Sequence, residues 1–184
     1  MRYFEQLAQG VDVLPLYHAI IRQPTLWNRQ DLRTTHPETP HKQVSDIWIR
    51  FNDMDKVRAN VSEILDEHES IWQPAAFLLP QCRPIIFDLM RRVEGERLGR
   101  VLITRLGPGG SIDPHVDGGS HAEYFDRYHV LLSNLPGSMF YAGSEEVFMQ
   151  TGSVWWFDNA QMHSVVNHSA EDRLTMIVDI RTLR

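Results

Sequence analysis

The chain has 184 residues, of which 42% are hydrophobic and 23% are charged, a composition typical of a globular protein with one substantial core. Its 18 basic and 24 acidic residues give a formal net charge of −6, so bulk charge does not attract nucleic acid and we expect no nucleic-acid partner. The only cysteine, Cys82, excludes an intramolecular disulfide, and no apolar run suggests a leader or a membrane span, so we expect a cytoplasmic protein without a membrane partner.

Helical periodicity dominates the first half of the chain. Apolar residues recur at helical spacing in three segments, which we expect to be amphipathic helices that pack on a sheet. These predicted helices span residues 11–23, 55–69 and 80–93. Residues 1–10 carry only a weak apolar pattern, which fits either a short strand or a docking segment.

Residues 24–42 are polar and rich in proline, and we interpret them as a loop. A loop of this length near a rigid scaffold often covers a site. We interpret its two histidines, His36 and His41, as surface residues, with metal binding as the less favoured alternative.

Residues 44–51 alternate between apolar and polar side chains, which predicts a strand. The alternation places Ile47 and Phe51 on one face and Trp48 and Arg50 on the other. If that second face opens on a pocket, Trp48 and Arg50 are candidates for substrate contact. The alternative is an edge strand with a solvated arginine.

From Leu98 onward the sequence consists of short apolar runs separated by glycine and proline turns. The predicted strands span residues 98–106, 111–117, 127–133, 138–142, 145–149, 153–157, 162–167 and 173–181. This number of short strands with Gly/Pro turns indicates a sandwich or a jelly roll. Neither half could bury a core well by itself, so we predict a single domain that spans residues 1–184.

The strand half contains a pattern of metal ligands. His115 and Asp117 are two residues apart in a predicted strand, so both side chains leave the same face, and His163 begins another strand. Two imidazoles and one carboxylate form the facial triad that binds non-haem Fe(II) and leaves positions open for other ligands. His121 and His168 are competing ligands without a suitable strand position. A His-x-Asp pair is also common without a metal, and that alternative stays open.

Arg173 opens the apolar final strand, where a guanidinium is costly unless it meets an anion. The far carboxylate of a dicarboxylic keto acid is a natural partner, and an internal ion pair with Glu171, Asp172 or another acidic residue is the alternative. In strand 127–133, His129 is well placed to donate to the same carboxylate, although a core histidine bonded to a carbonyl is also possible.

Four segments of the strand half carry specific motifs. Residues 104–115 lead from Thr104 through Gly-Pro-Gly-Gly to the first histidine of the pattern. Residues 127–132 read R-x-H-x-x-L, residues 152–164 contain G-x-x-W-x-x-D-x-x-x-x-H, and residues 173–179 read R-L-x-x-x-V-D. Together these segments resemble the catalytic core of the aspartyl/asparaginyl β-hydroxylase-like family of 2-oxoglutarate oxygenases, over somewhat under half of the chain.

The resemblance implies a mainly β fold with N-terminal helices, a double-stranded β-helix of jelly-roll, cupin-like type. It implies a dioxygenase that uses Fe(II), 2-oxoglutarate and dioxygen to hydroxylate its substrate, with His115 and His163 as metal ligands. Animal peptidyl hydroxylases of this family lack the acidic ligand, so Asp117 places the chain nearer to bacterial members with a full triad, among them hydroxylases of free proline. The residues that the resemblance implies for the 2-oxoglutarate pocket are Arg173, His129, Arg127 and Thr104.

We expect the substrate to be a free amino acid or derivative, or an Asp/Asn-type residue in a peptide. Residues 97–184 would then form the catalytic core, and residues 1–96 a helical buttress on the substrate side. Two other classes stay open. A cupin-like metal enzyme would keep its activity without 2-oxoglutarate, and a non-catalytic jelly-roll binding module would bind neither iron nor the keto acid. The sequence does not determine the oligomeric state.

Overall fold

The computed structural model describes residues 1–54 and 68–183. Its strands are β1 (Phe4–Ala8), β2 (Val44–Phe51), β3 (Ile71–Trp72), β4 (Gly95–Leu106), β5 (Ser111–His115), β6 (Asp126–Ser133), β7 (Ser138–Ala142), β8 (Glu145–Val147), β9 (Val154–Phe157), β10 (His163–Asn167) and β11 (Arg173–Thr182). Its helical elements are α1 (Leu14–Ile21), the 3₁₀ turn η1 (Pro24–Leu26), α2 (Leu32–Thr35), α4 (Ala75–Leu78), α5 (Cys82–Arg92) and α6 (Ser120–Tyr124). The helix predicted over residues 55–69 lies outside the described residues, apart from its last two positions, 68 and 69.

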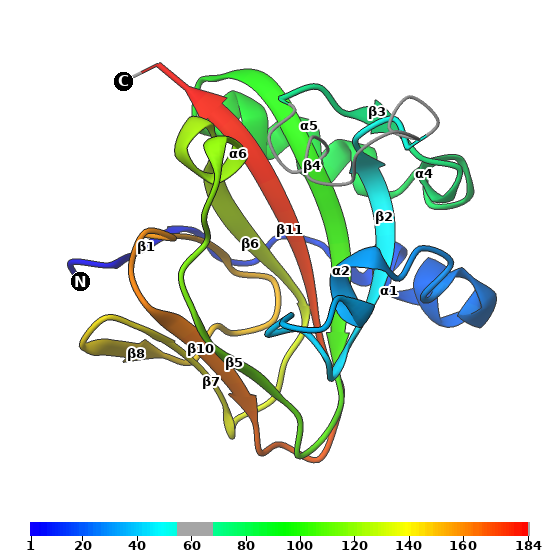
Figure 1. Ribbon diagram of the computed structural model, residues 1–184. Coiled ribbons are helices and arrows are strands. Elements are labelled where there is room, and N and C mark those ends of the chain that lie inside the picture. The colour runs from blue at the N-terminus through cyan, green and yellow to red at the C-terminus, as the bar shows by residue number, and fades with distance from the viewer. Residues whose placement is uncertain (55–67, 184) are drawn as a thin grey trace.

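The strands form two antiparallel sheets that face each other (Figure 1). The larger sheet has the order β1-β9-β6-β11-β4-β2-β3, and the smaller sheet has the order β5-β10-β7-β8. β11 is central in the larger sheet, because β4 and β6 pair along most of its length. Two facing sheets that interleave distant strands are characteristic of a jelly roll, and they confirm the predicted mainly β double-stranded β-helix.

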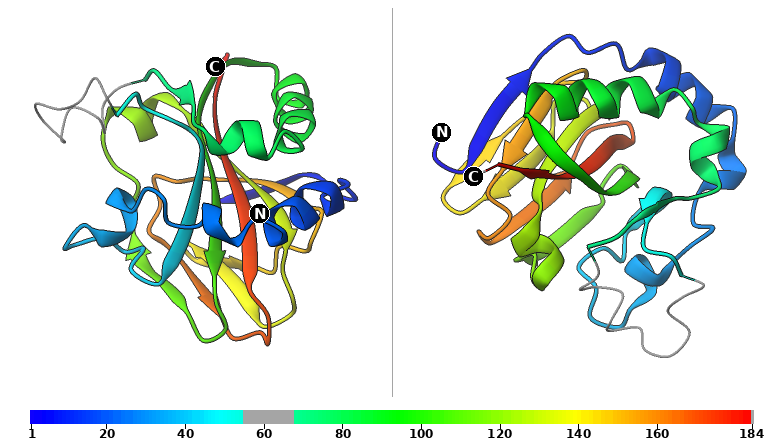
Figure 2. Two further views of the ribbon diagram at one scale, coloured as in Figure 1. Left: turned by 90° about the vertical axis from the view of Figure 1, so that its right-hand side faces the viewer. Right: turned by 90° about the horizontal axis from the view of Figure 1, so that it is seen from above.

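Residue alternation in β11 separates a hydrophobic core from the polar interior. Met176 and Val178 point to the outer face of the larger sheet, where they belong to one buried cluster with Ile20 of α1 and Ile86 of α5. Figure 2 shows these helices on that face, as the predicted packing of N-terminal helices on one sheet requires. Each fully buried side chain of this kind stabilises the fold by roughly 1.5–3 kcal/mol. The β11 residues on the opposite, inner face are Arg173, Thr175, Ile177 and Asp179.

A second core lies between the two sheets. Phe4, Phe140 and Phe157 form an aromatic cluster there, in which the ring centroids of Phe140 lie 5.6 Å from Phe4 and 4.8 Å from Phe157. The inner faces beside this cluster carry polar side chains instead. The second core thus fixes the spacing of the sheets at the edge of the polar region.

The strand predicted over residues 44–51 is β2, but a bulge between Trp48 and Arg50 interrupts its alternation. Trp48 therefore lies on the same side as Phe51, with ring centroids 3.9 Å apart. Arg50 extends to the other side and lies over the ring of Trp72, 4.7 Å from its centroid. The prediction that Trp48 and Arg50 share a face is wrong, because the extra residue of a bulge shifts every side chain that follows it to the opposite face.

Two other segments differ from the predictions. Residues 24–42 contain η1 and α2 rather than loop alone. β5 ends at His115, so Asp117 lies in the connection to α6, where its amide donates to the carbonyl oxygen of Asn159 at 3.2 Å. Across residues 1–54 and 68–183, no helix has the length and apolar character needed to cross a membrane.

Candidate metal centre

The end of β5 and the start of β10 bring two histidines together. His115 and His163 are cross-strand partners, and their ring centroids lie 4.2 Å apart. Asp117 presents Oδ1 to both rings, 3.7 Å from Nε2 of His115 and 3.9 Å from Nε2 of His163. Candidate ligand atoms of the three residues all lie within 4.8 Å of one another. The structure therefore assembles the three predicted ligands into a cluster that can hold one metal ion.

Backbone carbonyl groups fix the orientation of both imidazole rings. Nδ1 of His115 donates to the carbonyl oxygen of Asp113 at 2.7 Å, and Nδ1 of His163 donates to that of Gln161 at 2.9 Å. Because a carbonyl oxygen can only accept, Nδ1 carries the proton in each ring and Nε2 keeps its lone pair for a metal. Burial lowers the pKa of His163, which also favours the neutral, metal-binding form.

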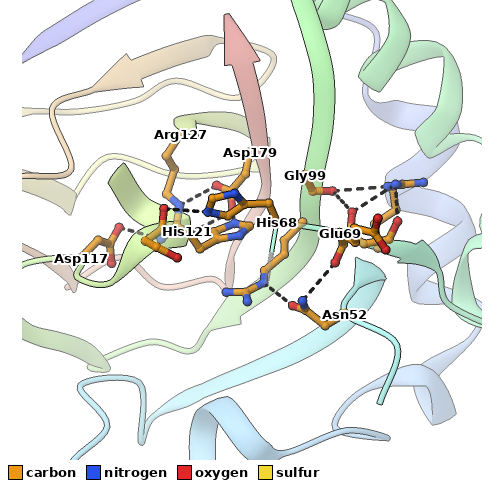
Figure 3. A network of polar contacts seen from close by, with 12 residues as sticks. Asn52, His68, Glu69, Gly99, Asp117, His121, Arg127 and Asp179 are labelled. Carbon is orange, nitrogen blue, oxygen red and sulfur yellow. Dashed lines mark hydrogen bonds and ion pairs between the residues drawn. The ribbon is translucent and has the colours of Figure 1, made fainter. Parts of the chain in front are cut away.

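A buried chain of charges holds Asp117 in place (Figure 3). Nη1 of Arg127 donates to Oδ2 of Asp117 at 2.7 Å, while its Nε and Nη2 donate to the two oxygens of Asp179 at 2.8 and 3.1 Å. Nε2 of His121 in turn donates to Oδ2 of Asp179 at 2.9 Å. One oxygen of Asp117 is thus occupied, and the other remains for a metal.

Mutual attraction keeps this chain ionised. Burial by itself raises the pKa of Asp179, but the guanidinium of Arg127 and the hydrogen bond from His121 outweigh it and bring the pKa below its usual range. Burial also disfavours the charged form of Arg127, yet the carboxylates of Asp117 and Asp179 raise its pKa above the ordinary value. Removal of Arg127 would leave the two carboxylates without their shared counter-charge, so this guanidinium holds the chain together.

A small cavity of about 30 Å³ lies between the sheets next to His115 and His163. Its walls include the four residues that the resemblance implied for the 2-oxoglutarate pocket, Arg173, His129, Arg127 and Thr104. The structure thus brings these four side chains to one place beside the metal-ligand cluster. Arg127, however, already donates to two carboxylates, so it differs from the other three in having little capacity for a further anion.

Arg173 is a buried cation that has no anionic partner among the residues that the structure describes. Its side chain is 3% exposed, and no carboxylate in the described part of the chain forms an ion pair with it. Asp172 faces Arg105 instead, at 3.9 Å, so the internal ion pair considered for Arg173 does not form with Asp172. Burial lowers the pKa of Arg173 to about 10, which still leaves the guanidinium charged at neutral pH. A charge in this state is costly until an anion binds.

Four buried polar atoms in or beside this cavity lack hydrogen-bond partners among the described residues: Nε of Arg173, Nδ1 of His129, Nδ1 of His41 and Oγ1 of Thr175. Buried polar atoms are normally bonded, so these orphans indicate that a ligand is needed. Burial, reinforced by the charge of Arg173, holds the pKa of His129 well below its usual value, so the ring is neutral and able to donate. The residues present therefore fit an acidic co-substrate. Thr175 was not among the pocket residues predicted from the sequence, although it lies on the same inner face of β11 as Arg173.

A larger cavity of about 470 Å³ adjoins the small one, because Arg33, His41 and Ile177 line both. Neither Trp48 nor Arg50, the two candidates for substrate contact, is among its lining residues. Trp48 is 1% exposed and packs behind the wall, and Arg50 donates to the carbonyl oxygens of residues 70 and 99 on the other side of the sheet. The structure therefore does not bring these two side chains to the candidate site.

The other candidate histidines take different places. His121 is buried in α6 and bonded to Asp179, and His168 is exposed after β10. His36 is exposed, as interpreted from the sequence. His41 is half-buried instead, with its ring edge-on to that of His115 at a centroid distance of 5.0 Å. Its interpretation as a surface residue is wrong, because its loop crosses β5 and is anchored there through backbone hydrogen bonding.

The model of the family described as Aspartyl/Asparaginyl beta-hydroxylase matches residues 63–182 of the chain. A comparison with curated protein sequences gave no match. The family match extends over both sheets and includes the whole metal-ligand cluster.

Several solved structures share the fold. A prolyl hydroxylase from Trichoplax adhaerens, in complex with a hypoxia inducible factor peptide fragment, is 9% identical over 98% of this chain and 84% of that one, with a TM-score of 0.65. A viral collagen prolyl hydroxylase from Paramecium Bursaria Chlorella virus-1, in a 2OG complex, is 9% identical over 98% and 97%, with a TM-score of 0.58. A 2OG-Fe(II) oxygenase family oxidoreductase from Burkholderia pseudomallei is 17% identical over 89% and 78%, with a TM-score of 0.56. At these identities the likeness concerns the fold alone.

Proposed function

The chain belongs to the aspartyl/asparaginyl beta-hydroxylase family, and on this basis we propose that it is an Fe(II)- and 2-oxoglutarate-dependent dioxygenase that hydroxylates an amino-acid-type substrate. One observation carries the proposal: the His115-Asp117-His163 cluster lies beside a buried arginine, Arg173, that has no carboxylate partner within the described ranges. A triad and an unpaired cation next to it are what a metal and a dicarboxylic keto acid require together.

In the proposed active site, His115, Asp117 and His163 hold Fe(II) through Nε2, Oδ1 and Nε2. If bound, the iron would activate dioxygen, which is the oxidant: one oxygen atom would enter succinate as CO2 leaves 2-oxoglutarate, and the other would enter a substrate C–H bond to give the hydroxyl group. Arg173 binds the far carboxylate of 2-oxoglutarate. Its planar guanidinium suits a carboxylate, and the low polarity of its surroundings strengthens the attraction.

The remaining polar side chains have assisting roles in this proposal. His129 donates from Nδ1 to the same carboxylate, and Thr104 contributes its hydroxyl group, which makes only a long hydrogen bond of 3.4 Å to the carbonyl oxygen of Thr175. Arg127 orients Asp117 rather than the keto acid, since its donors are engaged. None of these three roles requires the side chain to take part in bond making or breaking.

The substrate in this proposal is a free amino acid or a derivative, or a residue within a peptide. The peptide complex of the Trichoplax adhaerens prolyl hydroxylase supports keeping peptides among the candidates. We further propose that residues 1–184 form a single domain, in which residues 97–184 supply the metal and keto-acid ligands and residues 1–96 supply one wall of the larger cavity, including Arg33 and His41. The lone cysteine is consistent with the reducing cytoplasm as location.

The proposal is tested by succinate formation from 2-oxoglutarate with Fe(II) in air, first without and then with candidate substrates. Substrate-free turnover at a low rate, lost when 2-oxoglutarate or iron is omitted, supports it. A cupin-like metal enzyme that does not use the keto acid would convert its substrate equally well without 2-oxoglutarate, and a binding module would form no succinate. Either of those results contradicts the proposal.

A further inference from the structure

The larger cavity has apolar walls next to the proposed metal. Leu32, Phe51, Leu102 and Ile177 line it and belong to one hydrophobic cluster, which Trp48 supports from behind. Register places Leu102 opposite Ile177 on neighbouring strands. At about 470 Å³ the cavity has the size of a small-molecule site, large enough for one amino acid or one side chain of a peptide.

The cations that line this cavity already have partners. Arg33 donates from Nε and Nη2 to both oxygens of the buried Asp46, at 2.8 and 2.7 Å. Arg127 is engaged with the two carboxylates described above. The guanidinium of Arg100 lies over the ring of Phe51, 4.7 Å from its centroid, and its Nε donates to an amide oxygen at 2.9 Å. An acidic side chain in the cavity would have to compete with these partners, and to break a buried ion pair is costly.

One polar atom of the cavity wall stands apart. His41 lines both cavities, and its Nδ1 is buried without a hydrogen-bond partner. The segment that carries it is held in place, since the carbonyl oxygen of Pro40 accepts from the amide of Asp113 at 3.2 Å. The ring of His41 lies edge-on to that of His115 and has one unsatisfied nitrogen, for which a ligand at the junction of the two cavities would be the missing partner.

We propose that this cavity binds the substrate through an aliphatic or aromatic side chain, and that His41 forms a hydrogen bond with a polar group of the substrate's own backbone. The inference rests on the proposed function, because it assigns the substrate class of that same site. It predicts that the hydroxylated group is apolar rather than an aspartate or asparagine side chain. Whether the amino acid is free or part of a peptide does not change the chemistry of recognition.

The test uses two matched panels with the full chain. One consists of free L-valine, leucine, proline, phenylalanine, aspartate and asparagine, and the other of capped tripeptides with the same residues at the centre. Binding to the metal-free protein is followed through the ¹³C-labelled methyl signals of Leu102 and Ile177, and turnover through succinate formed above the substrate-free rate. Comparison of the two panels shows whether free amino acids or peptides are the source.

Methyl shifts and extra succinate with the apolar members of either panel support the inference. If only aspartate or asparagine compounds produce them, the inference is overturned while the proposed function stands. If no compound shifts the methyl signals, the inference is also overturned. If the protein forms no succinate under any condition, the proposed function fails, and the methyl shifts still decide which class of side chain the cavity accepts.

His41 is tested with His41→Leu and His41→Asn. Asparagine keeps a polar atom near the position of Nδ1, whereas leucine removes it. We expect His41→Leu to raise the half-saturating concentration of the best apolar compound about tenfold, and His41→Asn to stay within about threefold of the natural chain. His168→Leu, which alters an exposed histidine away from both cavities, is the control. Equal binding by His41→Leu and the natural chain overturns the role of His41.

Discussion

Nη1 of Arg127 donates to Oδ2 of Asp117 at 2.7 Å, so the carboxylate presents only Oδ1 to His115 and His163. The contact refines what the family resemblance implied. Arg127 does line the small cavity, but its guanidinium orients the candidate metal ligand Asp117 and has little capacity to bind the carboxylate of the keto acid. Partners that orient metal ligands commonly contribute 10–100-fold to metal affinity.

The role of this contact is tested by Asp179→Asn, which keeps the size of the side chain but removes the charge that anchors Arg127. With its anchor weakened, Arg127 no longer fixes Asp117, and we expect the affinity for Ni(II), a redox-stable substitute for iron, to fall about tenfold. Isothermal titration calorimetry measures this change. Asp172→Asn, which alters a half-exposed carboxylate on the Arg105 side, is the matched control. Unchanged Ni(II) affinity in Asp179→Asn contradicts the positioning role.

Single alanine substitutions of His115, Asp117 and His163 test the triad. Each removes one of three candidate ligands, so we expect succinate formation to fall below detection. The fold should persist, because these side chains lie at strand ends and in a connection rather than in the outer core, and circular dichroism checks this. Normal turnover in the Asp117→Ala protein would rule out the full triad.

Arg173→Ala tests the binding of the keto acid. Loss of one partner from a buried charge pair removes at least about 2 kcal/mol, so we expect the half-saturating concentration of 2-oxoglutarate to rise about 30-fold or more. Arg105→Ala changes a neighbouring arginine that is 37% exposed and already faces Asp172, and it should leave this concentration unchanged. A similar effect in both variants would show that general charge, not a specific contact, is responsible.

Replacement of Arg173 should weaken binding of the keto acid but stabilise the ligand-free protein. In the ligand-free protein Arg173 is a buried charge without a counterion in the described chain, so replacement by methionine, which keeps much of its volume, should stabilise the fold. We expect the Tm of the Arg173→Met protein to exceed that of the natural chain by at least about 2 °C. A lower Tm would mean that the contacts of the guanidinium with Sδ of Met149 and the ring of Phe140 outweigh the missing counterion.

Because His129 is buried in its neutral form, we expect the stability of the protein to depend on pH. The pKa of His129 in the folded state lies well below its value in the unfolded chain. Below pH ~6.5 the unfolded chain therefore binds a proton at this residue, whereas the native state does not. Stability is therefore lost as the pH falls, and this one residue accounts for about 1.4 kcal/mol between pH 7.5 and 5.5. Urea unfolding of the metal-free protein at both pH values measures the loss. His129→Asn should reduce it, and an identical loss in that variant contradicts the assignment.

Most strands between residues 98 and 181 could be predicted from the sequence, because short apolar runs between glycine and proline turns are compatible with few folds other than a sandwich or a jelly roll. The family resemblance is likewise confirmed by the family match over residues 63–182. The three ligands predicted from residue spacing, His115, Asp117 and His163, lie together in the structure, although Asp117 lies beyond the end of its strand, and their binding of a metal stays a prediction. Strand periodicity does not explain the position of Asp117, which is held beside the two histidines by its backbone hydrogen bond to Asn159 and by the contact with Arg127.

Long-range contacts could not be predicted in this way. Arg127 and Asp179 are 52 residues apart, and only the register of β6 against β11 makes them partners. The bulge in β2 leaves no clear signal in the alternation, and it turns Arg50 away from the face that carries the larger cavity. Trp48 stays on that face but lies behind Phe51 and Leu102, which line the cavity. His41 looked like a surface residue because nothing local indicates that its loop packs across β5.

The most direct measurement is an anaerobic titration of the purified protein with Fe(II) and then 2-oxoglutarate, followed by visible absorption. We predict that the weak charge-transfer band of an iron–keto-acid chelate appears in the natural chain and is lost, at the same concentrations, in the Arg173→Ala and His115→Ala proteins. Folded protein that binds Fe(II) but never develops the band with 2-oxoglutarate would contradict the proposed dioxygenase and favour a metal enzyme that does not use the keto acid.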